Sequence, residues 1–222
     1  MTVKEIFTEI YDNKLWGNGL NKFYSGPGSA EELIVQPYVQ KISDFLRAYI
    51  PKKPRIVDLG CGNFEVGKHF IDYCSEYIGV DIVPKLIEEL NKTKATSAVN
   101  FLCLDIIDDE LPNGDIAFLR QVLQHLSNEQ ILKILPKLRK YKIVFITEHY
   151  PTPNPGIVFN KNMVPGVRIR LEENSGAYLD KMPFNIPRDA LQLFLEVPRV
   201  GMGKECDPGI IQTYKLEFSA NE

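Results

Sequence analysis

Three aspartates in the sequence each lie in or end a short apolar run, and together they could bind one small ligand. Asp58 lies in the run RIVDLG, while Asp81 and Asp105 end the runs EYIGVD and NFLCLD. Gly60 and Gly62 follow Asp58, and glycines let the backbone turn tightly and approach a ligand. A carboxylate about twenty residues beyond such a loop can accept hydrogen bonds from both hydroxyls of a ribose. The spacing therefore predicts a nucleoside site.

The residue at the third glycine position of the dinucleotide-binding pattern is Glu65. That pattern places a pyrophosphate at a helix N-terminus, where a carboxylate would repel it. We therefore expect a ligand without phosphate that carries a positive charge, and an NAD-dependent oxidoreductase is the least favoured enzyme class. The alternative is an α/β domain whose glycines form an ordinary turn and whose acids cap helices, without a cofactor.

Short apolar runs alternate with helical segments through the middle of the chain. The runs are continuous, as in parallel strands that are covered on both faces. They span 55–60, 76–81, 100–105, 115–119 and 142–147, with helices expected over 65–73, 84–92 and 128–140. The C-terminal runs 191–197 and 209–218, separated by a glycine-containing turn, predict an antiparallel hairpin. The fold class is therefore α/β: a Rossmann-like, doubly wound, mostly parallel seven-stranded sheet with a C-terminal antiparallel hairpin.

The 222 residues are expected to form one domain, 1–222. Capping boxes are predicted at Ser29 with Glu32, which would start a helix over 30–49, and at Ser127 with Gln130. The four parts of the domain are a helical cap or lid over 1–50, a cofactor-binding core over 54–150, an acceptor loop over 151–190 and the hairpin over 191–218. The loop over 151–190 is too long to be a simple connection, so we expect it to be functional.

The aspartates and the glycine loop resemble the cofactor site of a class I S-adenosylmethionine-dependent methyltransferase. The resemblance implies that Asp58 and the glycine loop hold the methionine end of S-adenosylmethionine, that Asp81 holds the ribose, and that Asp105 with Ile106 lies at the adenine. The run FLRQVLQHLS resembles the fourth-strand region, which places Arg120 and Gln121 beside the cofactor. The residues expected at the cofactor are Trp16, Ser25, Asp58, Gly60, Cys61, Gly62, Asp81, Ile82, Asp105, Ile106, Arg120 and Gln121.

The motifs IYDNKLWG, SGPGS, TEHYP and SGAYLDKMPFNIP are similar to those of a small bacterial and viral methyltransferase group. Some members of that group act on sugar hydroxyls of surface glycans, which implies a small polar acceptor such as a saccharide. The resemblance also favours a lid in which Trp16, Tyr24 and Ser25 fold over the cofactor and exclude water. The alternative is a turn ahead of a capped helix.

The catalytic candidates are His149, Glu148 and His125. A hydroxyl acceptor must lose a proton during methyl transfer, and a histidine near the cofactor edge could take it. Glu148 could orient His149 only if the strand has ended at Thr147, because neighbouring strand residues point to opposite faces. The alternatives are a solvent-facing strand end for His149 and a packed, partly buried His125.

The acceptor-binding candidates are Arg168, Arg170 and Tyr178. Arg168 and Arg170 would share one face of an extended segment, where a guanidinium could bind hydroxyls or an anionic group. A pair of ordinary surface arginines is the alternative.

The net charge of -3 and the pI near 5.7 predict no nucleic-acid or membrane partner. The four cysteines are irregularly spaced, so we expect reduced thiols in the cytoplasm and no metal site. No segment resembles a signal peptide or a transmembrane helix.

The sequence predicts an O-methyltransferase with S-adenosyl-L-methionine as cofactor, S-adenosyl-L-homocysteine as product and a small-molecule acceptor. The alternatives are a nucleic-acid or protein methyltransferase and a non-catalytic module that binds S-adenosylmethionine; the oligomeric state is left open.

Overall fold

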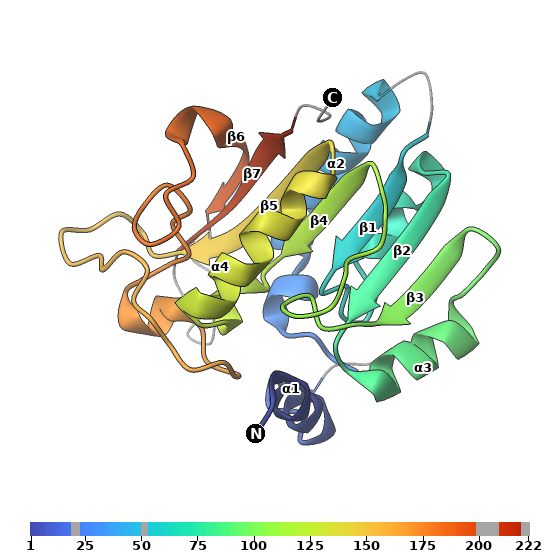
Figure 1. The fold of residues 1–222 in the computed structure, drawn as a ribbon, viewed down its shortest axis with the longest axis horizontal. Helices are drawn as coiled ribbons and strands as arrows, with labels where there is room; N and C mark the ends of the chain where they lie inside the picture. The colour runs from blue at the N-terminus through green and yellow to red at the C-terminus, as the bar shows by residue number, and fades with distance from the viewer. Residues whose placement is uncertain (19–22, 50–52, 199–208, 219–222) are drawn as a thin grey trace.

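The computed structural model describes residues 1–18, 23–49, 53–198 and 209–218, and contains a seven-stranded sheet in the order β3-β2-β1-β4-β5-β7-β6 (Figure 1). Strands β3, β2, β1, β4 and β5 are parallel, while β7 pairs antiparallel with both β5 and β6. The strands are β1 (Arg55–Leu59), β2 (Glu76–Asp81), β3 (Val99–Cys103), β4 (Ile116–Arg120), β5 (Ile143–Tyr150), β6 (Gln192–Pro198) and β7 (Ile210–Glu217). The predicted fold class and hairpin are confirmed, and the turn predicted within the hairpin falls largely on 199–208, outside the described residues.

Helices cover both faces of the sheet, which explains the continuous apolar strands. Helix α4 lies on one face of the sheet and α2 on the other (Figure 1). Side chains of α3 and of the 3-10 helix η2 pack in the same core cluster as those of α2. The α-helices are α1 (Val3–Asp12), α2 (Glu32–Ala48), α3 (Pro84–Thr93) and α4 (Asn128–Lys137). The 3-10 helices are η1 (Pro27–Ser29), η2 (Gly67–Tyr73), η3 (Leu123–His125), η4 (Leu138–Lys140), η5 (Arg170–Glu173) and η6 (Arg188–Ala190). No helix in the described parts of the chain has the length and apolar character needed to span a bilayer.

One predicted local feature of the helices is wrong, and one predicted helix differs in its type and its first residue. Ser29 is not the N-cap of α2: Pro27 begins the short helix η1, which contains Ser29, and α2 starts only after Glu31. The predicted helix over 65–73 is the 3-10 helix η2, which starts at Gly67. The capping box of Ser127 with Gln130 is confirmed at the start of α4.

Strand β5 continues to Tyr150, beyond the predicted end at Thr147. The reason is its long antiparallel pairing with β7, which runs from Ile143 opposite Glu217 to Tyr150 opposite Ile210. Because the strand is still extended at Glu148 and His149, their side chains lie on opposite faces of the sheet. The predicted pairing of Glu148 with His149 is therefore wrong.

Candidate functional site

A cavity of about 370 Å³ lies at the carboxyl edge of the parallel strands, where the strand order reverses between β1 and β4. This is the position at which open α/β sheets bind ligands, and the volume lies within the usual range for small-molecule sites. Every residue that the sequence assigns to the cofactor lines it: Trp16, Ser25, Asp58, Gly60, Cys61, Gly62, Asp81, Ile82, Asp105, Ile106, Arg120 and Gln121.

The glycine loop after β1 holds the first aspartate at the cavity. Gly60 and Gly62 have φ angles of 79° and 52°, in the left-handed region that favours glycine. Asp58 is buried and accepts a hydrogen bond from the Tyr77 hydroxyl. Burial raises the pKa of Asp58 to about 6, although the Tyr77 hydroxyl and the nearby Arg120 guanidinium lower it. A cation bound beside Asp58 would favour its ionised form.

Asp81 joins the glycine loop to the end of β2. One of its carboxylate oxygens accepts from the Gly62 amide at 3.1 Å, and the other accepts from the Val83 amide at 3.1 Å. Burial raises the pKa of Asp81 to about 6, and these amide bonds oppose the shift. A carboxylate has about four lone-pair sites, so Asp81 can still accept from a ligand's hydroxyls.

The turn after β3 carries Asp105 and Ile106 and is fixed by a lysine of α4. Asp105 Oδ1 accepts from the Ile107 amide at 2.9 Å. The ammonium of Lys137 donates to the carbonyl oxygens of Ile106, Ile107 and Asp109 at 3.2, 2.6 and 2.9 Å. Three carbonyls therefore match the three N–H donors of one lysine.

Arg120 and Gln121, after β4, hold the N-terminal segment against the cavity. Arg120 Nη2 donates to the Gly28 carbonyl at 2.6 Å, and its guanidinium lies 5.1 Å from the centre of the Tyr38 ring. The Gln121 carboxamide packs so closely on Gly28 that a Cβ there would lie 1.9 Å from Gln121 Oε1. A side chain at position 28 would therefore force the end of the Gln121 side chain to move.

The SGPGS segment has a second attachment, to the glycine loop itself. Ser25 Oγ accepts from the Asn63 amide at 3.0 Å and is bonded to the Tyr11 hydroxyl at 2.8 Å. Trp16 lies beside this contact, with its ring 5.0 Å from that of Tyr11 and 5.4 Å from that of His125. Trp16 and Ser25 thus both line the cavity, whereas Tyr24 is not among the described residues that line it.

The two residues at the end of β5 have different environments. His149 is 3% exposed and lines the cavity. Glu148 is fully buried outside it, and its carboxylate accepts from the amides of Val122, Leu123 and Gln124 at 3.1, 2.8 and 3.0 Å. Burial raises the pKa of Glu148 to about 8, against the lowering effect of these amides. Glu148 therefore holds the turn after β4 in place and does not orient His149.

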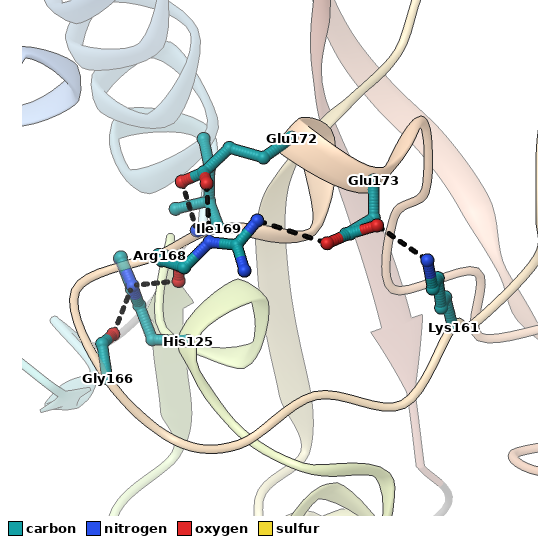
Figure 2. Close-up of polar contacts among 7 residues, drawn as sticks. All are labelled: His125, Lys161, Gly166, Arg168, Ile169, Glu172 and Glu173. Atoms are coloured by element: carbon teal, nitrogen blue, oxygen red, sulfur yellow. Dashed lines mark hydrogen bonds and ion pairs between the residues drawn. The ribbon is translucent and has the colours of Figure 1, made fainter.

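His125 lies on that turn, lines the cavity and binds the segment over 166–168 (Figure 2). Its Nδ1 lies 3.1 Å from the Gly166 carbonyl and 3.3 Å from the Arg168 carbonyl, so Nδ1 carries the proton. Its Nε2 lies 3.3 Å from Gln124 Nε2, which can donate to it. Burial lowers the pKa of His125 to about 4. His125 is thus a neutral, well-packed histidine and a weak base.

The predicted acceptor-binding residues do not come together in the cavity. Arg168 is exposed and pairs with Glu172 and Glu173, as Figure 2 shows. Arg170 is 1% exposed and donates to the carbonyls of Lys161 and Leu126, so the shared face predicted for the two arginines is wrong. Tyr178 packs between the rings of Tyr150 and Phe159, also outside the cavity.

Sequence reasoning missed several residues of the cavity wall. Tyr38 and Glu172 gave no local signal, because Tyr38 lies inside α2 and Glu172 lies in the short 3-10 helix η5. Tyr11 was missed as well, because its hydrogen bond to Ser25 joins two separate segments. Arg120 is the sole lysine or arginine among the described residues lining the cavity, which carries the carboxylates of Asp58, Asp81, Asp105 and Glu172. The described residues contain no His, Cys, Asp and Glu group arranged to hold a metal ion.

Comparison with known proteins gives one family model that matches part of the core. Residues 57–141 match a family model described as a methyltransferase domain. This segment runs from β1 through α4 and contains the three aspartates and the glycine loop. No curated protein sequence matches the chain.

Solved structures share the fold along almost the whole chain. The N-methyltransferase NodS from Bradyrhizobium japonicum WM9, in complex with S-adenosyl-L-homocysteine, superposes with a TM-score of 0.63 at 12% identity, covering 95% of this chain and 98% of NodS. Magnesium protoporphyrin IX methyltransferase (ChlM) from Synechocystis PCC 6803 with bound SAH gives 0.57 at 13%, covering 98% and 100%. The [4+2]-cyclase SpnF gives 0.61 at 14%, covering 99% and 98%. The family match and the shared fold support the resemblance to class I methyltransferases.

Proposed function

We propose that the protein is an S-adenosylmethionine-dependent methyltransferase that acts as one domain in the cytoplasm and methylates an oxygen of a small polar acceptor such as a saccharide. One observation carries the proposal: the residues assigned to the cofactor from the sequence all line a single cavity at the switch point of the sheet. The family match over 57–141 supports methyl transfer. The complexes of NodS and ChlM with S-adenosylhomocysteine support the choice of cofactor.

The donor groups of the cavity suit this cofactor. Asp58 and the backbone of Gly60 and Gly62 would hold the methionine end, where the buried carboxylate offsets a positive charge. Asp81 would accept from the ribose hydroxyls, and the turn of Asp105 and Ile106 would adjoin the adenine. When bound, the cofactor supplies an electrophilic methyl group on a sulfonium.

His149 is our candidate for the base. In the reaction, the acceptor oxygen attacks the methyl carbon in line, the carbon–sulfur bond breaks, and the acceptor's hydroxyl proton passes to a base. His149 lines the cavity at the end of β5, on the same face of the sheet as Arg120. His125 is a poorer base because its pKa is lowered to about 4 and Gln124 faces its Nε2.

Trp16 and the described residues 23–29 would close the cavity as a lid. Its two attachments, Ser25 to Asn63 and Gly28 to Arg120, join it to the glycine loop and to the end of β4. A closed segment there would exclude water from the sulfonium and keep the reacting atoms in place.

SpnF is named a [4+2]-cyclase although it shares this fold, so the fold alone does not imply methyl transfer. Cofactor binding and methyl transfer therefore need separate tests. Transfer is measured as radiolabel from the methyl group of S-adenosylmethionine onto separate panels of neutral glycosides, oligonucleotides and proteins. We expect label on the glycosides, and a loss of at least about tenfold in kcat for His149→Gln.

The matched control is His69→Gln, because His69 is exposed on η2 and does not line the cavity. Label on oligonucleotides or proteins instead would refute the acceptor class. A His149→Gln variant as active as His69→Gln would refute the base. Binding of S-adenosylhomocysteine without transfer to any panel would favour a non-catalytic module.

A further inference from the structure

Glu172 is a carboxylate on the wall of the cavity that the 151–190 segment provides. This segment contributes Val167, Ile169 and Glu172 to the lining. None of them belongs to the strand edge that carries the three aspartates. Glu172 is therefore placed to contact a second molecule beside the cofactor.

The Glu172 carboxylate is held in one orientation by its neighbours (Figure 2). Its Oε2 accepts from Arg168 Nε at 2.6 Å, and its Oε1 accepts from the Ile169 amide at 3.2 Å. An ionised carboxylate has about four lone-pair sites, so both oxygens can accept a further hydrogen bond. The side chain is 40% exposed, which leaves room for that partner.

The wall itself is attached to the turn after β4. His125 Nδ1 donates to the carbonyls of Gly166 and Arg168, and Arg170 Nη2 donates to the Leu126 carbonyl at 2.7 Å. Arg170 Nη1 also donates to the Lys161 carbonyl at 2.6 Å. Because Arg170 is buried, these bonds fix the segment to the core and place Glu172 reproducibly.

Glu172 shares its cation, Arg168, with a second carboxylate. Arg168 is shared, since its Nη2 also lies 3.0 Å from Glu173 Oε1, and Glu173 in turn pairs with Lys161 at 2.5 Å. Two cations and two carboxylates thus balance, with no cation in excess. Arg120, the sole lysine or arginine of the described cavity lining, donates to the Gly28 carbonyl at the end of β4.

We propose that Glu172 selects the acceptor by charge, accepting hydrogen bonds from hydroxyl groups of an uncharged molecule and disfavouring one that carries a carboxylate. The inference rests on the proposed function for the existence of an acceptor, and adds the chemical class and the residue that reads it. A buried or half-buried carboxylate facing a second carboxylate would cost free energy that hydroxyl donors do not. Phe7 and Trp16 line the same cavity and supply aromatic surface for the apolar side of such a molecule.

The test uses methyl glucoside and methyl glucuronide, which differ by one carboxylate. Each is titrated into protein with and without saturating S-adenosylhomocysteine, and binding is followed by the fluorescence of Trp16, the one tryptophan of the chain. Wild type is expected to bind the glucoside at least about tenfold more tightly than the glucuronide. Glu172→Gln should reduce this ratio to about twofold or less with an unchanged melting temperature.

Glu173→Gln is the matched control, because Glu173 binds the same arginine but does not line the cavity. It should keep the wild-type ratio. Equal binding of the two sugars to wild type, equal ratios in the two variants, or no saturable binding of the glucoside would each overturn the inference. Binding of S-adenosylhomocysteine is measured first in the same titration. If it does not bind, the proposed function is refuted; if it binds but the sugar ratio does not depend on residue 172, only the role of Glu172 is refuted.

Discussion

His125→Asn should make the protein less sensitive to acid than the wild type. In the folded protein, burial lowers the pKa of His125 to about 4, whereas an unfolded histidine titrates near its ordinary value of 6.5. Between these values the unfolded chain binds a proton that the folded protein does not. With respect to His125, the wild-type protein therefore keeps its full stability above about pH 6.5. Its free energy of unfolding falls as the pH drops towards 4, because the unfolded chain gains the proton first.

The size of the effect follows from the two pKa values. At about pH 5, the difference costs the wild type about 2 kcal/mol of unfolding free energy relative to neutral pH. Asparagine cannot take up this proton, but its side-chain amide can still donate to the Gly166 carbonyl in place of Nδ1. We therefore expect the variant to lose about 2 kcal/mol less than the wild type on acidification.

Urea unfolding followed by far-UV circular dichroism at about pH 7.5 and about pH 5 measures the difference. Asp58 and Asp81 act in the opposite direction, because their raised pKa values make the folded protein bind protons more readily than the unfolded chain. They are present in both proteins, so their contribution cancels between wild type and variant. Equal losses of stability in the two proteins would show that His125 is not held neutral as described.

Two further substitutions test the supports of the cavity. Gly62→Ala should lower stability by about 1–2 kcal/mol, because position 62 has a φ of 52° and a Cβ would lie 2.6 Å from Ser25 Oγ; chemical denaturation checks this, and an unchanged midpoint would contradict the described loop. Lys137→Met should weaken S-adenosylhomocysteine binding by about tenfold, since it removes three bonds to the turn after β3. Lys133→Met is its control, because Lys133 lies on the same helix as Lys137 but pairs with the exposed Asp108 side chain. Equal affinities of the two variants in calorimetry would refute the role of Lys137.

The fold and the cofactor edge were predictable because their signals are local. Continuous apolar strands, the glycines after Asp58 and the acids at strand ends are each visible within a few residues, and topology then brings Asp58, Asp81 and Asp105 to one edge. The capping box of Ser127 is also a local signal, although the same spacing at Ser29 does not form one.

The acceptor side was predicted less well because its contacts are long-range. The partners of Arg170 are the carbonyls of Lys161 and Leu126, which no sequence pattern links to it. Glu148 was assigned to catalysis because it adjoins His149, yet the length of β5 is set by its pairing with β7, more than sixty residues further along. Residue type indicated chemistry in both cases, and tertiary context decided between structural and functional roles.

Isothermal titration calorimetry with S-adenosylhomocysteine tests the proposed function most directly. Wild type should bind one equivalent, and Asp81→Asn should weaken binding at least about tenfold because it removes the charged acceptor for the ribose hydroxyls. Asp115→Asn should bind like wild type, since Asp115 accepts from the Arg55 amide and pairs with Lys142 at the opposite, amino edge of the sheet. No detectable heat of binding to wild type, or equal affinities for the two variants, would contradict the assignment of the cavity to this cofactor.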